Sequence, residues 1–431
     1  MEKKVLIIAY YWPPSGGSGV QRWLKFVKYL PGFGWHPYVF TPENPSFAAK
    51  DPSLLKDVPP EAEILHFPIW EPYEAFFKLS SLFDSKKTAQ STTLVSGDKK
   101  TFFQKVSTWL RGNLLIPDPR VFWVRPSVRF LNDFLRENEI TTIITTGPPH
   151  SIHLIGYRLK KKNPSVKWLA DFRDPWSEWG LLDSLMVGKF ARSIHRRMEA
   201  KVLRAADEVI TITPFYVRQF EALSNRKITL LTNGFDQDDF ENLTFEPTEK
   251  FVIRHVGIVN EKCDPRPFMR ALLSLAAEDA DFRVKLMVDF VGEVHPQFKA
   301  FVQNHPQLSG FTTFTDPLPH SELMLLYGRS SVLLLILTGY KDAEGYMPGK
   351  LFEYLATSVP VIGTGPENGD ASNLLREMGL EGLIDGNDTE RIKKNVMEIF
   401  DNWRTGTGVV PKKNAAKYSR REITRQLTEL L

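Results

Sequence analysis

Short apolar runs of strand length alternate with amphipathic helical segments along most of this chain of 431 residues. Runs rich in Val, Ile and Leu indicate buried strands, and apolar residues that recur at i, i+3 and i+4 indicate helices. In the first half, strands are expected at 5–9, 38–41, 64–67, 142–146, 168–171, 208–212 and 228–231. The helices expected among them are 20–30, 128–138, 151–162, 189–205 and 214–223. The alternation predicts an α/β fold with a parallel sheet flanked by helices.

The alternation stops near 233–250, where Asn, Asp, Glu, Thr and Pro dominate, and then starts again. We interpret this segment as an interdomain linker. The later strands are expected at 251–256, 284–291, 312–314, 332–337 and from 361, with helices at 265–277, 295–304 and 319–328. Two doubly wound domains in succession predict a ligand beyond the carboxyl ends of both sheets.

The composition is that of a globular protein, with 42% hydrophobic and 25% charged residues. The length suits two domains better than one core. The only cysteine, Cys263, excludes an internal disulfide and fits a reducing compartment, so a cytoplasmic location is expected. The apolar run at the N-terminus is too short for a signal sequence, and no window approaches the roughly 18 apolar residues of a membrane span.

The most informative local pattern lies at 345–363, where a Gly/Pro loop, a short amphipathic helix and a buried strand follow one another. The loop is expected to present the backbone N–H groups of Gly349, Lys350 and Leu351 at a helix N-terminus, where the helix dipole favours an anion. Glu353 lies on that helix. A phosphate at the helix start and a hydroxyl group on the carboxylate would suit a nucleotide-sugar. An ordinary loop–helix–strand unit is the alternative interpretation.

The run Pro348-Gly-Lys-Leu-Phe-Glu-Tyr-Leu-Ala, followed by Pro360-Val-Ile, resembles the donor-site motif of the retaining glycosyltransferase family 4, which has the GT-B fold. This resemblance implies two Rossmann-like domains facing across a cleft. Residues 1–245 would form the acceptor-side domain and 246–414 the donor domain, with a helix in 415–431 returning to the first.

The same resemblance implies a reaction. A sugar would move from a nucleotide-diphosphate-sugar donor to a hydroxyl group of a saccharide or lipid-linked acceptor, in the synthesis of a cell-surface polysaccharide or glycoconjugate. No cofactor and no catalytic metal are expected, and the chain has no Asp-x-Asp triplet. In this family a first Glu precedes the helix Glu at a fixed spacing. Here Gly345 occupies that position and Glu344 lies one residue before it, so Glu344 is the expected counterpart.

Two glycine-containing loops are candidates for phosphate contact, because glycine lets a ligand approach the backbone closely. Gly16 and Gly17 follow the first strand, in a loop that matches neither the Walker nor the dinucleotide pattern. A simple turn is the alternative, but the loop resembles the Gly-Gly loop of family 4. Gly257 ends the first strand of the second domain. Many family members have Arg after that glycine; here Lys262 and Arg266 are expected to neutralise the diphosphate.

Polar residues at the ends of two further strands complete the predicted site. His150 follows strand 142–146 and would donate a hydrogen bond to the donor sugar, unless it is only a helix cap. Asp171, Arg173 and Asp174 follow strand 168–171 next to two aromatic residues and would bind a polar, ring-shaped acceptor. An internal Arg–Asp pair that orders the loop is the alternative.

A basic, aromatic-rich region lies between Lys78 and Arg129, where ten Lys and Arg face three Asp, while the whole chain has a net charge of +4. Such a region fits an anionic membrane surface, and a solvated face over an ordinary core is the alternative. Nucleic acid is not expected as a partner, because no recognised module accompanies the patch. A sugar-binding GT-B protein without activity and a nucleotide-sugar epimerase remain the other functional interpretations.

Overall fold

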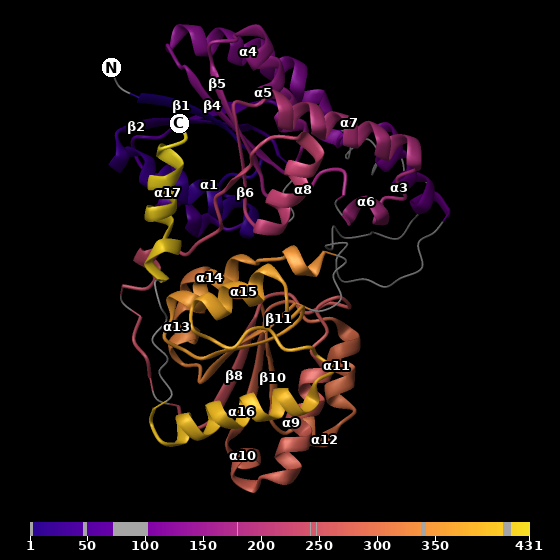
Figure 1. The fold of residues 1–431 in the computed structure, drawn as a ribbon, viewed down its shortest axis with the longest axis vertical. Coiled ribbons are helices and arrows are strands. Elements are labelled where there is room, and N and C mark those ends of the chain that lie inside the picture. The colour runs from indigo at the N-terminus through magenta and orange to yellow at the C-terminus, as the bar shows by residue number, and fades with distance from the viewer. Residues whose placement is uncertain are drawn as a thin grey trace. The chain divides into compact units, whose positions relative to one another are not determined.

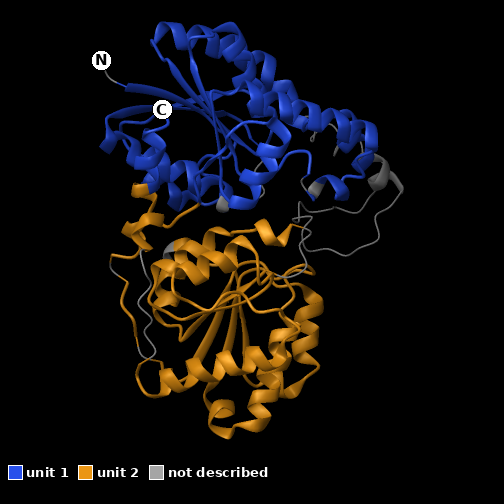
Figure 2. Cartoon of the chain, viewed as in Figure 1, with its two compact units in different colours: residues 1–232, 423–431 blue, residues 233–422 orange. Residues whose placement is uncertain are grey.

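The computed structural model describes residues 3–45, 50–71, 102–178, 180–241, 243–246, 248–337, 342–407 and 415–431. The chain divides into two compact units, coloured separately in Figure 2. The first comprises Met1–Thr232 and Ile423–Leu431, and the second Asn233–Glu422. From the sequence, the division was expected after residue 245 and the return at 415, whereas the two units divide after Thr232 and again before Ile423.

The first unit contains a seven-stranded parallel sheet in the order β3-β2-β1-β4-β5-β6-β7. Its strands are β1 (Lys3–Ile8), β2 (Trp35–Pro42), β3 (Glu63–Phe67), β4 (Thr142–Gly147), β5 (Lys167–Phe172), β6 (Glu208–Thr211) and β7 (Thr229–Leu230). Strand β1 ends in a continuous apolar run because helices cover both faces of a parallel sheet, whereas the neighbouring strand β4 also contains buried threonines. In β1, every residue from Val5 to Ile8 is fully buried.

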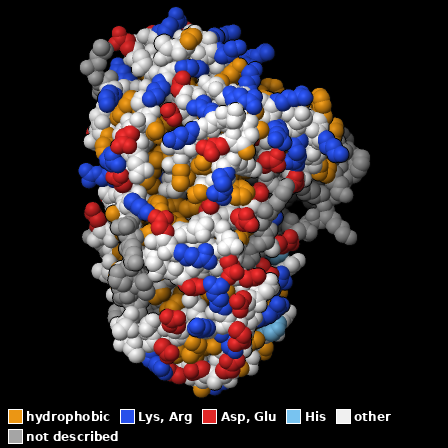
Figure 3. Space-filling model, viewed as in Figure 1, with side chains coloured by type: hydrophobic (Ala, Val, Ile, Leu, Met, Phe, Trp, Pro, Cys, Tyr) orange, Lys and Arg blue, Asp and Glu red, His pale blue; other side chains and the backbone are white. Residues whose placement is uncertain are grey.

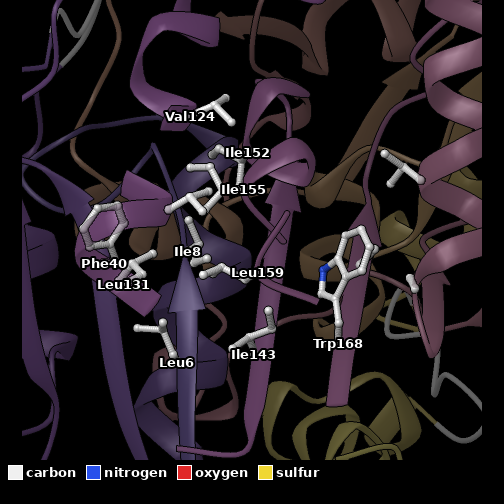
Figure 4. Packing of buried hydrophobic residues seen from close by; sticks show 14 of the residues in the cluster. Leu6, Ile8, Phe40, Val124, Leu131, Ile143, Ile152, Ile155, Leu159 and Trp168 are labelled. Atoms are coloured by element: carbon white, nitrogen blue, oxygen red, sulfur yellow. The ribbon is translucent and has the colours of Figure 1, made fainter. Parts of the chain in front are cut away.

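Helices lie on both faces of this sheet (Figure 1). The helices of this unit are α1 (Ser18–Tyr29), α3 (Phe102–Leu114), α4 (Val124–Glu137), α5 (Ser151–Lys162), α6 (Leu181–Ser184), α7 (Lys189–Ala205), α8 (Pro214–Ser224) and the part of α17 (Arg420–Thr428) from Ile423 on. Leu6 and Ile8 of β1 face the core shared with α4, α5, α7 and α8, part of which Figure 4 shows. Val5 and Ile7 face the opposite core, which is shared with α1 and α17.

The second unit contains a five-stranded parallel sheet in the order β10-β9-β8-β11-β12. Its strands are β8 (Phe251–Val256), β9 (Leu286–Val291), β10 (Thr312–Thr315), β11 (Val332–Ile336) and β12 (Val361–Thr364). Its helices are α9 (Arg266–Glu278), α10 (Ala280–Lys285), α11 (Pro296–Gln303), α12 (Pro306–Ser309), α13 (His320–Gly328), α14 (Gly349–Ala356), α15 (Asp370–Glu377) and α16 (Thr389–Arg404). The core on one face involves α9, α10, α11 and α16, and the core on the other α13, α14 and α15.

The predicted fold class, two parallel sheets flanked by helices, is confirmed. Some bounds differ. Strand β2, expected from 38, begins at Trp35, and the strand expected from 284 begins at Leu286, because α10 occupies the preceding residues. The Asp279 side chain caps that helix by accepting a hydrogen bond from the Phe282 N–H at 2.8 Å. Much of the basic region, residues 78–101, lies outside the described residues. Of the described helices, none combines the length and the apolar character that crossing a bilayer requires.

The strand order reverses once in each sheet, between β1 and β4 in the first unit and between β8 and β11 in the second. Loops that leave the carboxyl ends of strands at such a switch point are the common place for ligands in α/β proteins. The loop with Gly16 and Gly17 follows β1, and the segment with His150 follows β4. In the second unit Gly257 follows β8, and the segment that leads into α14 follows β11.

Candidate functional site

Glycines shape the turn that follows β8 in the second unit. Gly257 has φ of +122° and Gly292, at the end of the neighbouring strand β9, has φ of +131°. A Cβ atom on Gly292 would lie 2.5 Å from the Gly257 carbonyl oxygen, so the close approach of the two loops requires glycine there. A Cβ atom on Gly257 would lie 3.3 Å from Nζ of Lys350. The absence of a side chain at Gly257 therefore leaves the Lys350 ammonium group uncovered on that side.

Lys350 is the cation that the fold places beside this turn. Its Nζ donates to the carbonyl oxygen of Val256 at 3.0 Å and lies 3.3 Å from Nε2 of His255. Nδ1 of His255 lies 3.0 Å from the Leu334 carbonyl oxygen, so Nδ1 donates there and Nε2 accepts from Lys350. Within the described residues no acidic side chain forms an ion pair with Lys350. Burial lowers the pKa of Lys350 to about 8, and the charge of nearby Glu353 opposes that shift.

The ammonium group of Lys350 belongs to the first turn of α14. The N–H groups of Gly349 and Lys350 precede the first intrahelical bonds and donate to no carbonyl of the described chain. A Cβ atom on Gly349 would meet nothing within 4 Å, so this helix start is open. Free N–H groups, the positive end of the helix dipole and an ammonium group together form a cradle suited to an anion such as a diphosphate.

Glu353 lies one turn further along α14 and is held by two other residues. Its Oε2 accepts a hydrogen bond from the Tyr327 hydroxyl at 2.7 Å, and its Oε1 lies 3.3 Å from Nε2 of His320. Burial acts to raise the pKa of Glu353, but the hydrogen bonds from His320 and Tyr327 outweigh burial and lower it. The Glu353 side chain is 24% exposed, so the charged carboxylate that these two residues orient is not fully enclosed.

Three other residues predicted for the donor site, Arg266, Lys262 and Glu344, have surroundings that differ from those of Lys350 and Glu353. Arg266 is paired with the adjacent Asp264, at 2.7 Å between Nη2 and Oδ2, so its charge is already neutralised. Lys262 is an exposed residue in the same loop. Glu344 is exposed in the middle of a short 3₁₀ turn, Ala343–Gly345. Its backbone packs against Gly369, whose added Cβ atom would lie 3.1 Å from the Glu344 Cα.

In the first unit, Arg173 ties together the two loops at the switch point. Its guanidinium group donates to the carbonyl oxygens of Gly19 at 2.6 Å, Gly147 at 3.0 Å and Pro148 at 3.0 Å. Gly17, the N-cap residue of α1, has φ of +91°, and a Cβ atom there would meet nothing within 4 Å. The loop is therefore open at Gly17, whereas a Cβ atom on Gly16 would lie 3.4 Å from the Asp51 side chain. Arg173 holds the following residues in place through the Gly19 carbonyl oxygen.

Asp171 is fully buried and forms the centre of a polar network. Its carboxylate accepts from the Arg22 guanidinium at 3.2 and 3.3 Å, from Nε1 of Trp23 at 2.6 Å and from the Thr146 hydroxyl at 2.9 Å. Burial lowers the pKa of Arg22, and the charge of Asp171 opposes that shift. Arg22 also donates to the carbonyl oxygens of Leu231 and Thr232. Asp171 thus joins α1, β4 and β5.

The prediction that the loop after β5 exposes its side chains is wrong for most of its residues. Asp171 and Arg173 are buried, as are the two aromatic residues Phe172 and Trp176. Asp174 is the exception: it is partly exposed and makes no hydrogen bond or ion pair within the described chain. Burial by the loop raises the pKa of Asp174, and the charge of Arg173 opposes that shift. Of the three predicted acceptor residues, only Asp174 offers a group to a ligand.

His150 lies in an aromatic cluster rather than at an open surface. It is 4% exposed, and its ring stacks on Trp176 with 5.2 Å between ring centroids and an interplanar angle of 2°. Burial, together with nearby His153, lowers the pKa of His150 well below its ordinary value, so the ring is neutral. A direct contact between His150 and a sugar would require this packing to open.

Two groups of the donor-side cluster were missed by the sequence analysis. Tyr327 ends the helix α13 and holds Glu353, but nothing in its neighbourhood distinguishes it from a core tyrosine. His320 begins α13, and its ring turns toward Glu353. His255 carried a signal, because a histidine within the apolar strand β8 has to find a buried partner.

Comparisons with known proteins bear on the fold. No protein-family model and no curated protein matches the sequence. Solved structures match over nearly the full length, including a glycosyltransferase from Rickettsia africae ESF-5, with a TM-score of 0.65 and 14% identity, covering 100% of this chain and 97% of that one. A sucrose-phosphate synthase from Thermosynechococcus elongatus gives a TM-score of 0.59 at 16% identity, covering 99% of this chain and 98% of that one.

The same architecture serves other chemistry. A putative UDP-N-acetylglucosamine 2-epimerase from Listeria monocytogenes matches with a TM-score of 0.55 at 11% identity, covering 99% of this chain and 95% of that one. At these identities the likeness defines a class of fold: the chain has a GT-B-like fold, as nucleotide-sugar glycosyltransferases do. Membership of family 4 stays a prediction from the motif at 344–363.

Proposed function

We propose that this protein is a retaining glycosyltransferase that moves a sugar from a nucleotide-diphosphate-sugar to a hydroxyl group of a saccharide or lipid-linked saccharide. The observation that carries the proposal is the anion cradle of Gly257, Gly349 and Lys350 with the carboxylate of Glu353 one helical turn beyond it. The cradle suits the diphosphate, and the carboxylate suits the ribose hydroxyl groups. Asp174 and the Gly16–Gly17 loop of the first unit are proposed for the acceptor side, and Glu344 for the donor sugar.

The proposed reaction needs charge stabilisation more than a nucleophile. Negative charge grows on the leaving diphosphate as the glycosidic bond to it breaks, and a leaving phosphate oxygen accepts the proton of the acceptor hydroxyl. The acceptor oxygen attacks the anomeric carbon on the same face from which the diphosphate departs, so the anomeric configuration is retained. Lys350 and the N–H groups of α14 supply positive charge where it develops. We therefore expect this chemistry to proceed without a divalent metal.

An epimerase and a sugar-binding protein without activity are the competing functions. An epimerase acts on the nucleotide-sugar alone and has to abstract a proton from its carbon skeleton. Glu353 is the only acidic residue of helix α14, and the side chains of Tyr327 and His320 already orient its carboxylate. This arrangement favours binding of hydroxyl groups. Nucleotide-sugar consumption that depends on an added acceptor would separate transfer from both alternatives.

The stereochemistry and metal requirement of the reaction can be tested together. Purified protein is offered UDP-, GDP- and ADP-sugars with lipid-linked and free saccharide acceptors, and product is followed by NMR. We expect the anomeric configuration of the donor sugar to be kept and the rate to be unchanged in excess chelator. An inverted product, or activity that chelator removes and magnesium or manganese restores, would contradict the proposal.

Glu353→Ala is expected to weaken binding of the donor nucleotide. The variant removes a charge-assisted hydrogen bond that contributes about 1.5–3 kcal/mol, or about a 10- to 150-fold rise in Kd measured by calorimetry. Because Tyr327 loses its acceptor in this variant, Tyr327→Phe serves as the matched control: it breaks the same internal bond and keeps the carboxylate. Equal nucleotide affinity in Glu353→Ala and Tyr327→Phe would show that Glu353 only supports the fold.

A further inference from the structure

Two neighbouring helices of the first unit concentrate positive charge. Helices α5 and α7 together contain ten Lys and Arg and one Glu, and the Glu, Glu199, is buried. The net charge of the whole chain is only +4. The two helices contact each other and cover the same face of the sheet. Their opposite faces are therefore turned away from the core. Figure 3 shows Lys and Arg side chains over the part of the first unit where α7 runs.

Most of these cations are exposed and have no acidic partner in the described chain. Eight of them form no ion pair there. Arg204 donates to the carbonyl oxygens of Leu223 and Ser224 instead, and the other seven are Arg158, Lys161, Lys162, Lys189, Arg196, Arg197 and Lys201. In contrast, Lys160 pairs with Asp207 at 2.8 Å and Arg192 pairs with Asp183. A solvated helix face would more often mix both signs of charge and form pairs at i, i+4. The charge of the remaining seven is thus available to an external anion.

The cations surround an apolar groove between the two helices. The groove is lined by Leu154, Tyr157, Arg158, Met198, Lys201 and Val202. The ammonium groups of Lys201 and Lys161 lie 4.8 and 5.8 Å from the centre of the Tyr157 ring. The cationic groups therefore lie at the rim of a groove whose lining is mostly aliphatic and aromatic. We call Arg158, Lys161, Arg197 and Lys201 the basic face.

Large apolar side chains are exposed next to the basic face, at the start of α7. Phe190 is 79% exposed and lies seven residues before Arg197, so both occupy one stripe of the helix. Met186 and Trp109 are also exposed. The side chain of Asn113 in α3 holds this region together, because it donates to the Met186 carbonyl oxygen at 3.1 Å and accepts from the Gly188 N–H at 2.8 Å. We call Trp109, Met186 and Phe190 the apolar tip.

We propose that the basic face and the apolar tip form a docking surface for an anionic lipid bilayer. Cations would contact lipid phosphates, while the side chains of the tip enter the boundary between headgroups and acyl chains. A nucleic acid would use the cations but gain little from an exposed Phe and Met. The surface differs from the region Lys78–Arg129 singled out by the sequence, since it is built on α5 and α7. The proposal rests on no catalytic step and goes beyond the proposed transfer reaction.

Flotation of the full chain with lipid vesicles tests this surface. Wild-type protein is expected to float with vesicles of phosphatidylcholine and phosphatidylglycerol at low salt, and to stay below vesicles of phosphatidylcholine alone. The triple variant Arg158→Glu, Arg197→Glu, Lys201→Glu is expected to lower partition about a hundred-fold or more, because each basic residue contributes about a factor of five to ten. Phe190→Ser is expected to lower partition about tenfold at both low and high salt.

A matched control reverses three exposed cations of the second unit, Arg270→Glu, Arg283→Glu and Lys394→Glu, and gives the same change in net charge. Partition of this control is expected to stay close to that of wild type. The proposal is overturned if wild-type protein does not float with the anionic vesicles, or if both triple variants lose vesicle binding equally. Binding of wild-type protein to duplex DNA but not to vesicles would also overturn it. Since no turnover is measured, failure here leaves the transfer reaction standing.

Discussion

Lys350→Met is expected to lower the turnover number for sugar transfer by about a hundred- to a thousand-fold. Removing one preorganised group that faces developing negative charge typically has an effect of this size. Methionine keeps an unbranched side chain of similar length and removes the charge together with the hydrogen bonds of Nζ to Val256 and His255. The expected loss is in turnover rather than in the free energy of unfolding, because the ammonium group donates to one carbonyl oxygen and one ring nitrogen and forms no ion pair within the described chain.

The pH profile gives a second measure of the same group. The pKa of Lys350 is lowered to about 8, so its charge is present below that pH and is lost as the pH rises through it. We expect kcat/KM of the wild type, which reports on the free enzyme, to fall above pH about 8. Lys350→Arg is expected to remove that decline. Lys262→Met is the comparison variant, and a larger loss of turnover in it than in Lys350→Met would move the anion-neutralising role to Lys262.

Asp171→Leu is expected to destabilise the first unit by about 3–5 kcal/mol, the cost of leaving a buried cation without its partner. Arg22 would remain in the core with its positive charge, and Nε1 of Trp23 and the Thr146 hydroxyl would lose their acceptor. The measurement is urea-induced unfolding followed by tryptophan fluorescence. The double variant Arg22→Met, Asp171→Leu is expected to recover part of the loss, since it removes both charges.

Asp174→Asn provides the contrast for this prediction. Asp174 lies in the loop after β5, three residues beyond Asp171, which belongs to the strand itself. It makes no hydrogen bond or ion pair within the described chain, so the free energy of unfolding of the variant is expected to stay within about 0.5 kcal/mol of that of the wild type. Its KM for the acceptor is expected to rise if it binds that substrate. Equal destabilisation by Asp171→Leu and Asp174→Asn would contradict the division between a structural and a functional carboxylate.

The fold could be predicted because its signals are local. Apolar runs such as Val332–Leu337 identify a buried strand from composition alone, and the periodicity of 151–162 and 189–205 gave helices with the bounds found in the structure. Helix α10 was missed because a strand-like run follows it directly. The limit at Thr232 was missed because the linker signal is compositional, whereas the boundary depends on which residues pack together.

The candidate site was harder to predict because it depends on how the charged side chains are placed relative to one another in three dimensions. The sequence singled out Asp171, Arg173 and Asp174 together, yet their roles differ by burial alone, which adjacent residues in a loop do not reveal. Arg266 was expected to face the diphosphate, but its guanidinium group pairs with Asp264. Lys350 was assigned to the donor site for its backbone N–H, while its side chain turns back to Val256, a contact between residues far apart in the chain.

The discontinuity of the first unit has a consequence for synthesis of the chain. Residues 423–431 are translated after all of the second unit, yet Ile423 and Leu427 belong to the core beside α1. During translation, synthesis of the second unit is therefore finished before the last residues of the first unit have been added. Until those residues emerge, Val20, Leu24 and Val27 of α1 lack part of their apolar cover. A nascent first unit is thus exposed to aggregation for the time that translation of about 190 further residues takes.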